Sequence, residues 1–155
     1  MYDVDQAEEL LTAHQHSSEH AIELRKLLAL KLHADPLERA AAMAAEYTDR
    51  ISLHFAYEEE HVFPALLAVC MTKDVQALVD ELLAEHVLIA RLWGPFALGD
   101  APEDPAQFAQ DVETAIQVLL DHAAKEDARL IPLLQEHDSA IRLWLRQREA
   151  EGAAD

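Results

Sequence analysis

The segment HFAYEEEHVFP at residues 54–64 recurs as HAAKEDARLIP at residues 122–132, and this repeat decides the fold. Each copy places a glutamate four residues after a histidine and a proline ten residues after that histidine. Residues four apart lie on one face of an α-helix, about one turn from each other. The repeat therefore predicts two helices of the same design, each presenting a His/Glu pair and each kinked or ended at its proline.

A shorter phrase precedes each copy of the repeat. ELLTAH at residues 9–14 matches ELLAEH at residues 81–86, so each preceding helix also carries one histidine near its apolar stripe. The chain is therefore predicted to be two similar helical hairpins. On the first helix we favour His14 as the inward histidine over His16 and His20, which lie nearer the polar side and would add a ligand only if the helix were rotated.

The composition favours helices, because apolar residues make up 51% of the 155 residues and only three are glycine. Asp35-Pro36, Thr72 and Asp104-Pro105 have the form of helix starts. They predict helices at roughly residues 4–33, 36–63, 73–98 and 105–130, with a short one near 139–149. Four long helices with short links indicate an all-α, up-down antiparallel four-helix bundle. We expect residues 1–151 to form this single domain and residues 152–155 to be a frayed tail.

Charge and cysteine content exclude several classes of protein. The net charge of −18 repels phosphate backbones and anionic lipid, so we expect neither nucleic acid nor a membrane surface as a partner. The single cysteine, Cys70, excludes an internal disulfide and a cysteine-rich metal site. The apolar run at 64–71 is too short to span a membrane, and the first residues lack the pattern of a signal peptide. We expect a cytoplasmic protein, with the last helix covering one bundle end or forming a homodimer contact.

Six side chains with metal-binding groups are predicted to converge inside the bundle: His14, His54, Glu58, His86, His122 and Glu126. Unpaired buried charges cost several kcal/mol each, and the repeat places no basic residue but Arg129 near this face. Two divalent metal ions would satisfy all six groups, and imidazole with carboxylate suits iron, manganese or zinc. If both glutamates bridge, each ion receives two histidines and two oxygens, which leaves open positions for a small ligand such as O2.

Neighbouring residues allow other interpretations. His61 lies one turn further along the same face and is a candidate to support the ligands, whereas Glu59 and Asp127 belong to a solvated acidic face. A ferritin-like di-metal oxidase needs two inward Glu-x-x-His motifs, but Arg129 replaces the histidine of the second. A metal-free interaction or phosphotransfer module needs only one exposed histidine and gives no reason for the doubled pattern.

These paired H-x-x-x-E-[ED]-x-x-[VL]-[FI]-P segments, each preceded by E-L-L-x-x-H, resemble the hemerythrin-like family of HHE cation-binding domains. The resemblance covers essentially the whole chain. It implies an up-down four-helix bundle that holds a non-haem di-iron centre bridged by carboxylates. The iron ligands that it implies are His14, His54, Glu58, His86, His122 and Glu126, with the two glutamates as bridges.

The sequence departs from oxygen-carrying hemerythrins at two positions. Leu82 stands where they have a further histidine, and a leucine cannot coordinate metal. Asp127 stands at the spacing of their last acidic ligand, so the bridge is either Glu126 or Asp127, and the repeat favours Glu126. A site short of one histidine has more open coordination. This favours O2, NO or peroxide sensing, iron handling or redox protection over reversible O2 carriage.

Overall fold

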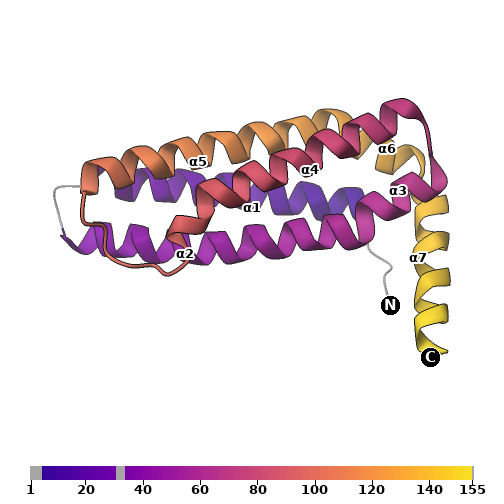
Figure 1. Cartoon of the computed structure of the whole chain (residues 1–155), viewed down its shortest axis with the longest axis horizontal. Coiled ribbons are helices and arrows are strands. Elements are labelled where there is room, and N and C mark those ends of the chain that lie inside the picture. Colours follow the sequence, from indigo (N-terminus) through magenta and orange to yellow (C-terminus); the bar gives the residue numbers. More distant parts are fainter. Residues whose placement is uncertain (1–4, 31–33, 155) are drawn as a thin grey trace.

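A computed structural model describes residues 5–30 and 34–154 of the chain. Four long helices form the bundle: α1 (Gln6–Ala29), α2 (Ala34–Tyr57), α4 (Lys73–Trp93) and α5 (Pro105–Lys125). Successive helices run in opposite directions (Figure 1), and α1 packs against α2 and α5 while α4 packs against the same two helices. No strand occurs in the described ranges. The predicted all-α, up-down bundle is confirmed.

Side-chain caps start three of these helices. The Asp5 carboxylate accepts a hydrogen bond from the Ala7 amide, Thr72 Oγ1 accepts one from Val75, and the Asp104 carboxylate accepts one from Gln107. The predicted start at Asp35-Pro36 is wrong by two residues, because α2 begins at Ala34. Proline is tolerated there since the first-turn amides of a helix have no partner within it. The predicted ends of the first helix, at residues 4 and 31–33, lie outside the described residues.

The prolines of the repeat do not end their helices, so the predicted helix ends at residues 63 and 130 are wrong. A π-helical turn precedes each one, η1 (Glu58–Val62) and η3 (Glu126–Leu130), and the chain continues as α3 (Phe63–Val69) and α6 (Ile131–Glu136). The residue before each proline closes the wide turn, since the Phe63 amide donates to the Glu58 carbonyl and the Ile131 amide to the Glu126 carbonyl. This five-residue spacing accommodates a proline that would clash within a regular turn.

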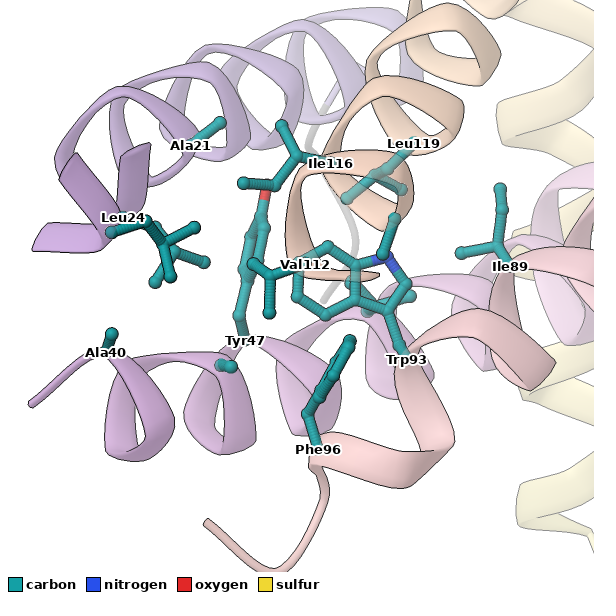
Figure 2. Close-up of a cluster of buried hydrophobic side chains, with 14 of the residues drawn as sticks. Ala21, Leu24, Ala40, Tyr47, Ile89, Trp93, Phe96, Val112, Ile116 and Leu119 are labelled. Carbon is teal, nitrogen blue, oxygen red and sulfur yellow. The ribbon is translucent and has the colours of Figure 1, made fainter. Parts of the chain in front are cut away.

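The hydrophobic core is divided into two clusters by a polar layer. One cluster surrounds Trp93, whose ring meets the edge of Tyr47 at 4.9 Å between centroids (Figure 2), and it fills the end near the α4–α5 link. The other surrounds Leu66 and Leu82 at the opposite end. His14, His86 and His122 come from the segments between the two clusters, and His54 lies at the edge of the first, next to Phe55. The polar groups are therefore enclosed by apolar packing on both sides.

The last helix, α7 (Asp138–Ala153), covers one end of the bundle. It lies across the long helices (Figure 1), packs against α3 and α6, and buries Ile141. It is longer than the predicted 139–149 and includes Gly152, so the segment predicted as a frayed tail is helical as far as Ala153. None of the described helices combines the length and apolar character that a membrane crossing requires.

Candidate metal centre

All four long helices and both π turns contribute to the polar layer. α1 carries His14, α2 carries His54, α4 carries His86 and α5 carries His122, while Glu58 and Glu126 each begin a π turn. The two glutamates are fully buried, three histidines are buried, and His54 is partly exposed. The structure thus brings all six predicted residues into one layer of the bundle.

Within this layer the donor atoms form two groups. One donor atom from each of His14, His54, Glu58 and Glu126 lies within 4.8 Å of the other three. Glu58, His86 and His122 form a second group by the same measure, so Glu58 belongs to both. Each hairpin therefore supplies the two histidines of one group. A shared carboxylate between two donor groups is the arrangement expected for a pair of neighbouring metal ions.

The carboxylate of each π turn contacts one histidine of its own hairpin and one of the other hairpin. Glu58 lies 2.8 Å from His54 Nε2 through Oε1 and 3.0 Å from His86 Nε2 through Oε2. Glu126 Oε1 lies 3.0 Å from His122 Nε2 and 3.4 Å from His14 Nε2. The four Nε2 atoms therefore point toward the glutamates, into the centre of the bundle.

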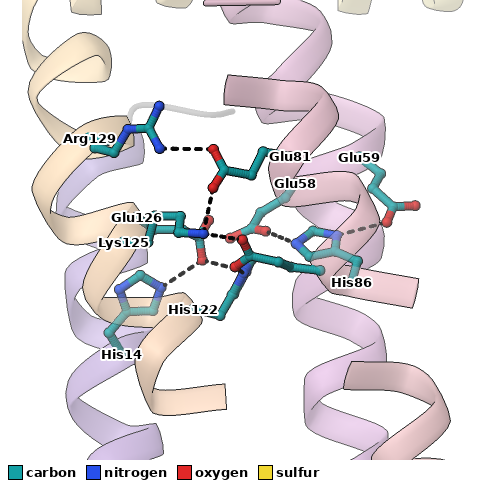
Figure 3. A network of polar contacts seen from close by, with 10 residues as sticks. His14, Glu58, Glu59, Glu81, His86, His122, Lys125, Glu126 and Arg129 are labelled. Carbon is teal, nitrogen blue, oxygen red and sulfur yellow. Dashed lines mark hydrogen bonds and ion pairs between the residues drawn. The ribbon is translucent and has the colours of Figure 1, made fainter. Parts of the chain in front are cut away.

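Three histidines are held from behind by a second carboxylate. His14 Nδ1 lies 2.5 Å from Asp127 Oδ1. His86 Nδ1 lies 2.8 Å from Glu59 Oε1, as Figure 3 shows. The Nδ1 atom of the third, His122, lies 3.0 Å from an oxygen of Glu85. Because a carboxylate only accepts, each neutral ring carries its proton on Nδ1 and presents the Nε2 lone pair to the centre. This is the outer support that metal-binding histidines use.

The donor atoms at the centre lack hydrogen-bond partners, although buried polar atoms are normally hydrogen-bonded. Across the part of the chain that the structure describes, nine buried side-chain nitrogen and oxygen atoms have none. One is the indole nitrogen of Trp93; the other eight are the Nε2 atoms of the four histidines and both oxygens of each glutamate. Their close contacts lack hydrogen-bond geometry, and all eight are atoms that coordinate metal. The residues therefore fit a dinuclear cation site.

The electrostatics of the centre indicate how it behaves without metal. Burial by itself would lower the pKa of His14, but contacts with Glu126 and Asp127 raise it to about 9. Burial alone would also lower the pKa of His122. The carboxylates of Glu126 and Glu85 outweigh the effect of burial, so this pKa is raised. Burial alone would raise the pKa of Glu58, yet His54 and His86 hold it well below its usual range. Without metal, protons on His14 and His122 thus balance part of the negative charge of the carboxylates.

A series of ion pairs between side chains on the outer surface leads to this centre (Figure 3). Arg129 Nη1 lies 2.9 Å from Glu81 Oε2, and Lys125 Nζ lies 2.7 Å from the other oxygen of Glu81. Lys125 also contacts Glu85, which holds His122. Arg129, the basic residue that the sequence placed near the site, thus pairs with an outer carboxylate and leaves the buried glutamates to other partners.

Structure separates the other candidate histidines from the centre. His20 uses both ring nitrogens elsewhere, at 3.2 Å from the His16 carbonyl oxygen and 3.1 Å from Arg50 Nη1, and its ring stacks on Tyr47. His16 is exposed. His61 lines a separate cavity of about 200 Å³ against α7. None of the three belongs to either donor group found among the described residues.

The two adjacent acids of the second π turn, Glu126 and Asp127, have different roles. Glu126 is fully buried among the donors, whereas Asp127 is 43% exposed and holds His14 from outside. The position of Glu126 agrees with its preference over Asp127 as the bridging acid. Glu59 and Asp127 are solvent-exposed, as predicted for an acidic face, but each also orients a histidine, and the sequence prediction missed this role.

A cavity opens beside the histidines of the first hairpin. It has a volume of about 180 Å³, and its walls include the donors His14, His54, His122 and Glu126 together with Ile51, Phe55 and Leu119. His54 is the most exposed of the four histidines, at 23% of its side chain. A diatomic molecule fits within this volume, since water occupies about 30 Å³ in the liquid. The cavity therefore lies directly against the donor groups of the centre.

Fold and site together define the class of protein: a helical bundle that gathers buried histidine and glutamate side chains around one cation-binding centre. The family model for the hemerythrin HHE cation binding domain matches residues 5–134, which is most of the chain. The chain belongs to this family. No curated protein and no solved structure matches it.

Proposed function

We propose that this protein is a non-haem di-iron protein that binds O2, or the related molecules NO or peroxide, in sensing, iron handling or redox protection. The observation that carries the proposal is the set of eight buried donor atoms without hydrogen-bond partners. Two cations at the centre would satisfy all of them. Nitrogen and oxygen donors without thiolate suit iron, and would also accept manganese or zinc.

The two donor groups support a division of the ligands between the two ions. His14 and His54 would hold one ion, His86 and His122 the other, and Glu58 and Glu126 would lie between them. A ferrous pair supplies the electrons with which O2 or peroxide can react. The chain supplies orientation, because the outer carboxylates fix three rings, and it supplies a dry surrounding of apolar clusters on both sides.

The cavity favours small, uncharged ligands at the ion of the first hairpin. Its apolar walls come from Ile51, Phe55 and Leu119, and the nearby guanidinium of Arg50 is already paired with Glu46 at 2.7 Å. O2 and NO need no charged partner to enter such a space. We therefore expect exogenous ligands to reach the His14/His54 side of the centre.

The test is to load the metal-free chain anaerobically with ferrous iron, count the bound ions, and titrate with O2 under optical and Mössbauer observation. Two ions per chain and an O2-dependent spectral change are expected. A reversible change indicates sensing or carriage, whereas rapid irreversible oxidation indicates iron handling or redox protection. Fewer than two ions, or two ions that O2 leaves unchanged, would contradict the proposal.

A variant that narrows the cavity tests the access route. Ala13 lines the cavity, so Ala13→Leu should slow the reaction with O2 while the iron content stays at two. Ala84→Leu, at an exposed position on α4, is the matched control and should leave the rate unchanged. Equal rates in the two variants would show that ligands enter elsewhere.

A further inference from the structure

The two halves of the centre are related by the internal repeat, so equivalent positions can be compared. Glu9 corresponds to Glu81, as each lies five residues before the histidine of its helix. Tyr57 corresponds to Lys125, each three residues after a histidine. The outer contact is also equivalent, because Tyr57 Oη donates to Glu9 at 3.2 Å where Lys125 donates to Glu81.

One pair of equivalent positions breaks this symmetry. Glu85 comes directly before His86, whereas Ala13 comes directly before His14. Glu85 holds His122 Nδ1 at 3.0 Å, but an alanine has no group with which to hold His54. In the described ranges no carboxylate lies within ion-pair distance of His54 Nδ1. His54 is therefore the one histidine of the four without outer support from an acid.

Lys125 strengthens the support on the second hairpin. It contacts both Glu81 and Glu85, so that it fixes the carboxylate behind His122. The Glu85 side chain is 21% exposed, against 43% for Asp127 and 45% for Glu59. A more enclosed and charge-assisted carboxylate holds its partner more rigidly.

The two histidine pairs also differ in burial, and the pair of the second hairpin, which has the stronger outer support, is the more buried one. The side chains of His86 and His122 are 3% and 2% exposed, while those of His14 and His54 are 8% and 23% exposed. The cavity of about 180 Å³ is lined by both histidines of the first pair and by one of the second, His122. Ligand rings that are buried and held from behind lose less freedom when they bind an ion.

We infer that the two metal positions are unequal: Glu85, fixed by Lys125, makes the His86/His122 position the tight one, and the His14/His54 position exchanges its ion. This inference rests on the proposed dinuclear centre and adds an order of loading to it. The ion of the second hairpin binds first and remains. The ion of the first hairpin binds second, at the position whose histidines both line the cavity.

Titration of the metal-free chain with cobalt(II) tests the inference, with d–d absorption and heat as readouts. The wild-type chain should bind two ions in two resolved steps. His54→Gln should abolish the second step and leave the first, whereas His122→Gln should remove the tight step. Fewer than two ions in the wild type would refute the dinuclear proposal itself. Two ions bound in one unresolved step, or the reverse pattern in the histidine variants, would overturn only the order of loading.

Outer-carboxylate variants assign the cause. Removing such a partner lowers metal affinity about 10- to 100-fold, so Glu85→Ala should weaken the first step by this factor and bring the two steps together. Asp127→Asn, which releases His14, should weaken the second step and separate them further. Lys125→Met should weaken the first step less than Glu85→Ala does, and Lys125→Arg should restore it. Equal effects of Glu85→Ala and Asp127→Asn on both steps would overturn the assignment.

Adding a carboxylate behind His54 provides an independent check, because this variant removes no group from the centre. Ala13→Glu places a carboxylate at the position equivalent to Glu85, where it can reach His54. The second step should become tighter, and thermal unfolding of the metal-free variant reports whether the fold is retained. A folded Ala13→Glu chain whose second step is unchanged or weaker would count against outer support as the source of the inequality.

Discussion

The stability of the metal-free chain should fall as the pH rises from 6.5 to 9.5, whereas that of the metal-loaded chain should not, and His14 shows why. Burial alone would lower its pKa, but Glu126 and Asp127 raise it from 6.5 to about 9 in the folded, metal-free chain. A group with a raised pKa binds its proton more tightly when folded. Its stabilisation is therefore complete below pH 6.5 and is lost as the pH rises through about 9. At about 1.4 kcal/mol per pH unit, this loss amounts to about 3 kcal/mol.

Bound metal cancels this loss of stability. An ion can bind Nε2 of His14 only when that atom has no proton, so protons compete with metal throughout the same range. Stabilisation by a fixed metal concentration therefore grows as the pH rises. Urea unfolding at several pH values between 6.5 and 9.5 should show a loss of at least about 3 kcal/mol without metal, since the raised pKa of His122 adds to that of His14, and no such loss with excess ferrous iron under anaerobic conditions.

Two variants identify His14 as the source of the loss. His14→Gln should remove about 3 kcal/mol of the pH-dependent change in the metal-free chain, whatever it does to stability at one pH. Asp127→Asn should remove a part of it, because Asp127 is the second of the two carboxylates that raise this pKa. A metal-free wild type whose stability is flat or rises toward pH 9.5 would refute the reasoning, as would a His14→Gln chain with the wild-type slope.

Three further predictions concern the centre and its packing. Glu58→Ala and Glu126→Ala should each reduce metal content below one ion per chain by elemental analysis, and loss in only one variant would contradict bridging by both acids. Metal binding at pH 7 should release at least one proton per chain, seen as a calorimetric enthalpy that changes with buffer, and no release would contradict the raised pKa values. Phe55, 7% exposed, stacks on His86 at 3.7 Å between centroids, so Phe55→Ala should lower the free energy of unfolding by about 3–5 kcal/mol in urea. Leu53→Ala, at a position 72% exposed, should change it by less than about 0.5 kcal/mol.

The histidines and glutamates of the centre could be predicted because their spacing is a local property of helices. His54 and Glu58 share a face whatever the rest of the chain does, and the same holds for His122 and Glu126. Because the same segment occurs twice in the sequence, both His/Glu pairs were predicted to contribute to one site. His14 needed an additional step, since its choice over neighbouring histidines depended on the apolar stripe of its helix.

The supporting carboxylates could not be predicted in the same way. Glu59, Glu85 and Asp127 each hold a histidine on a different helix, so their roles depend on the rotation and register of helices relative to one another. A sequence pattern fixes neither. One signal was present, because an acidic residue follows the glutamate in both copies of the repeat, but a solvated face explains two adjacent acids equally well.

The π turns give these adjacent acids a joint role that a regular helix would not. A π turn has more residues per turn than an α-helix, so successive side chains diverge by a smaller angle. Glu58 and Glu59 can therefore both reach His86, one at each ring nitrogen, and Glu126 and Asp127 do the same at His14. In both cases the acids come from one hairpin and the histidine from the other. Each hairpin thus orients a histidine that belongs to its partner, and neither can form the centre alone.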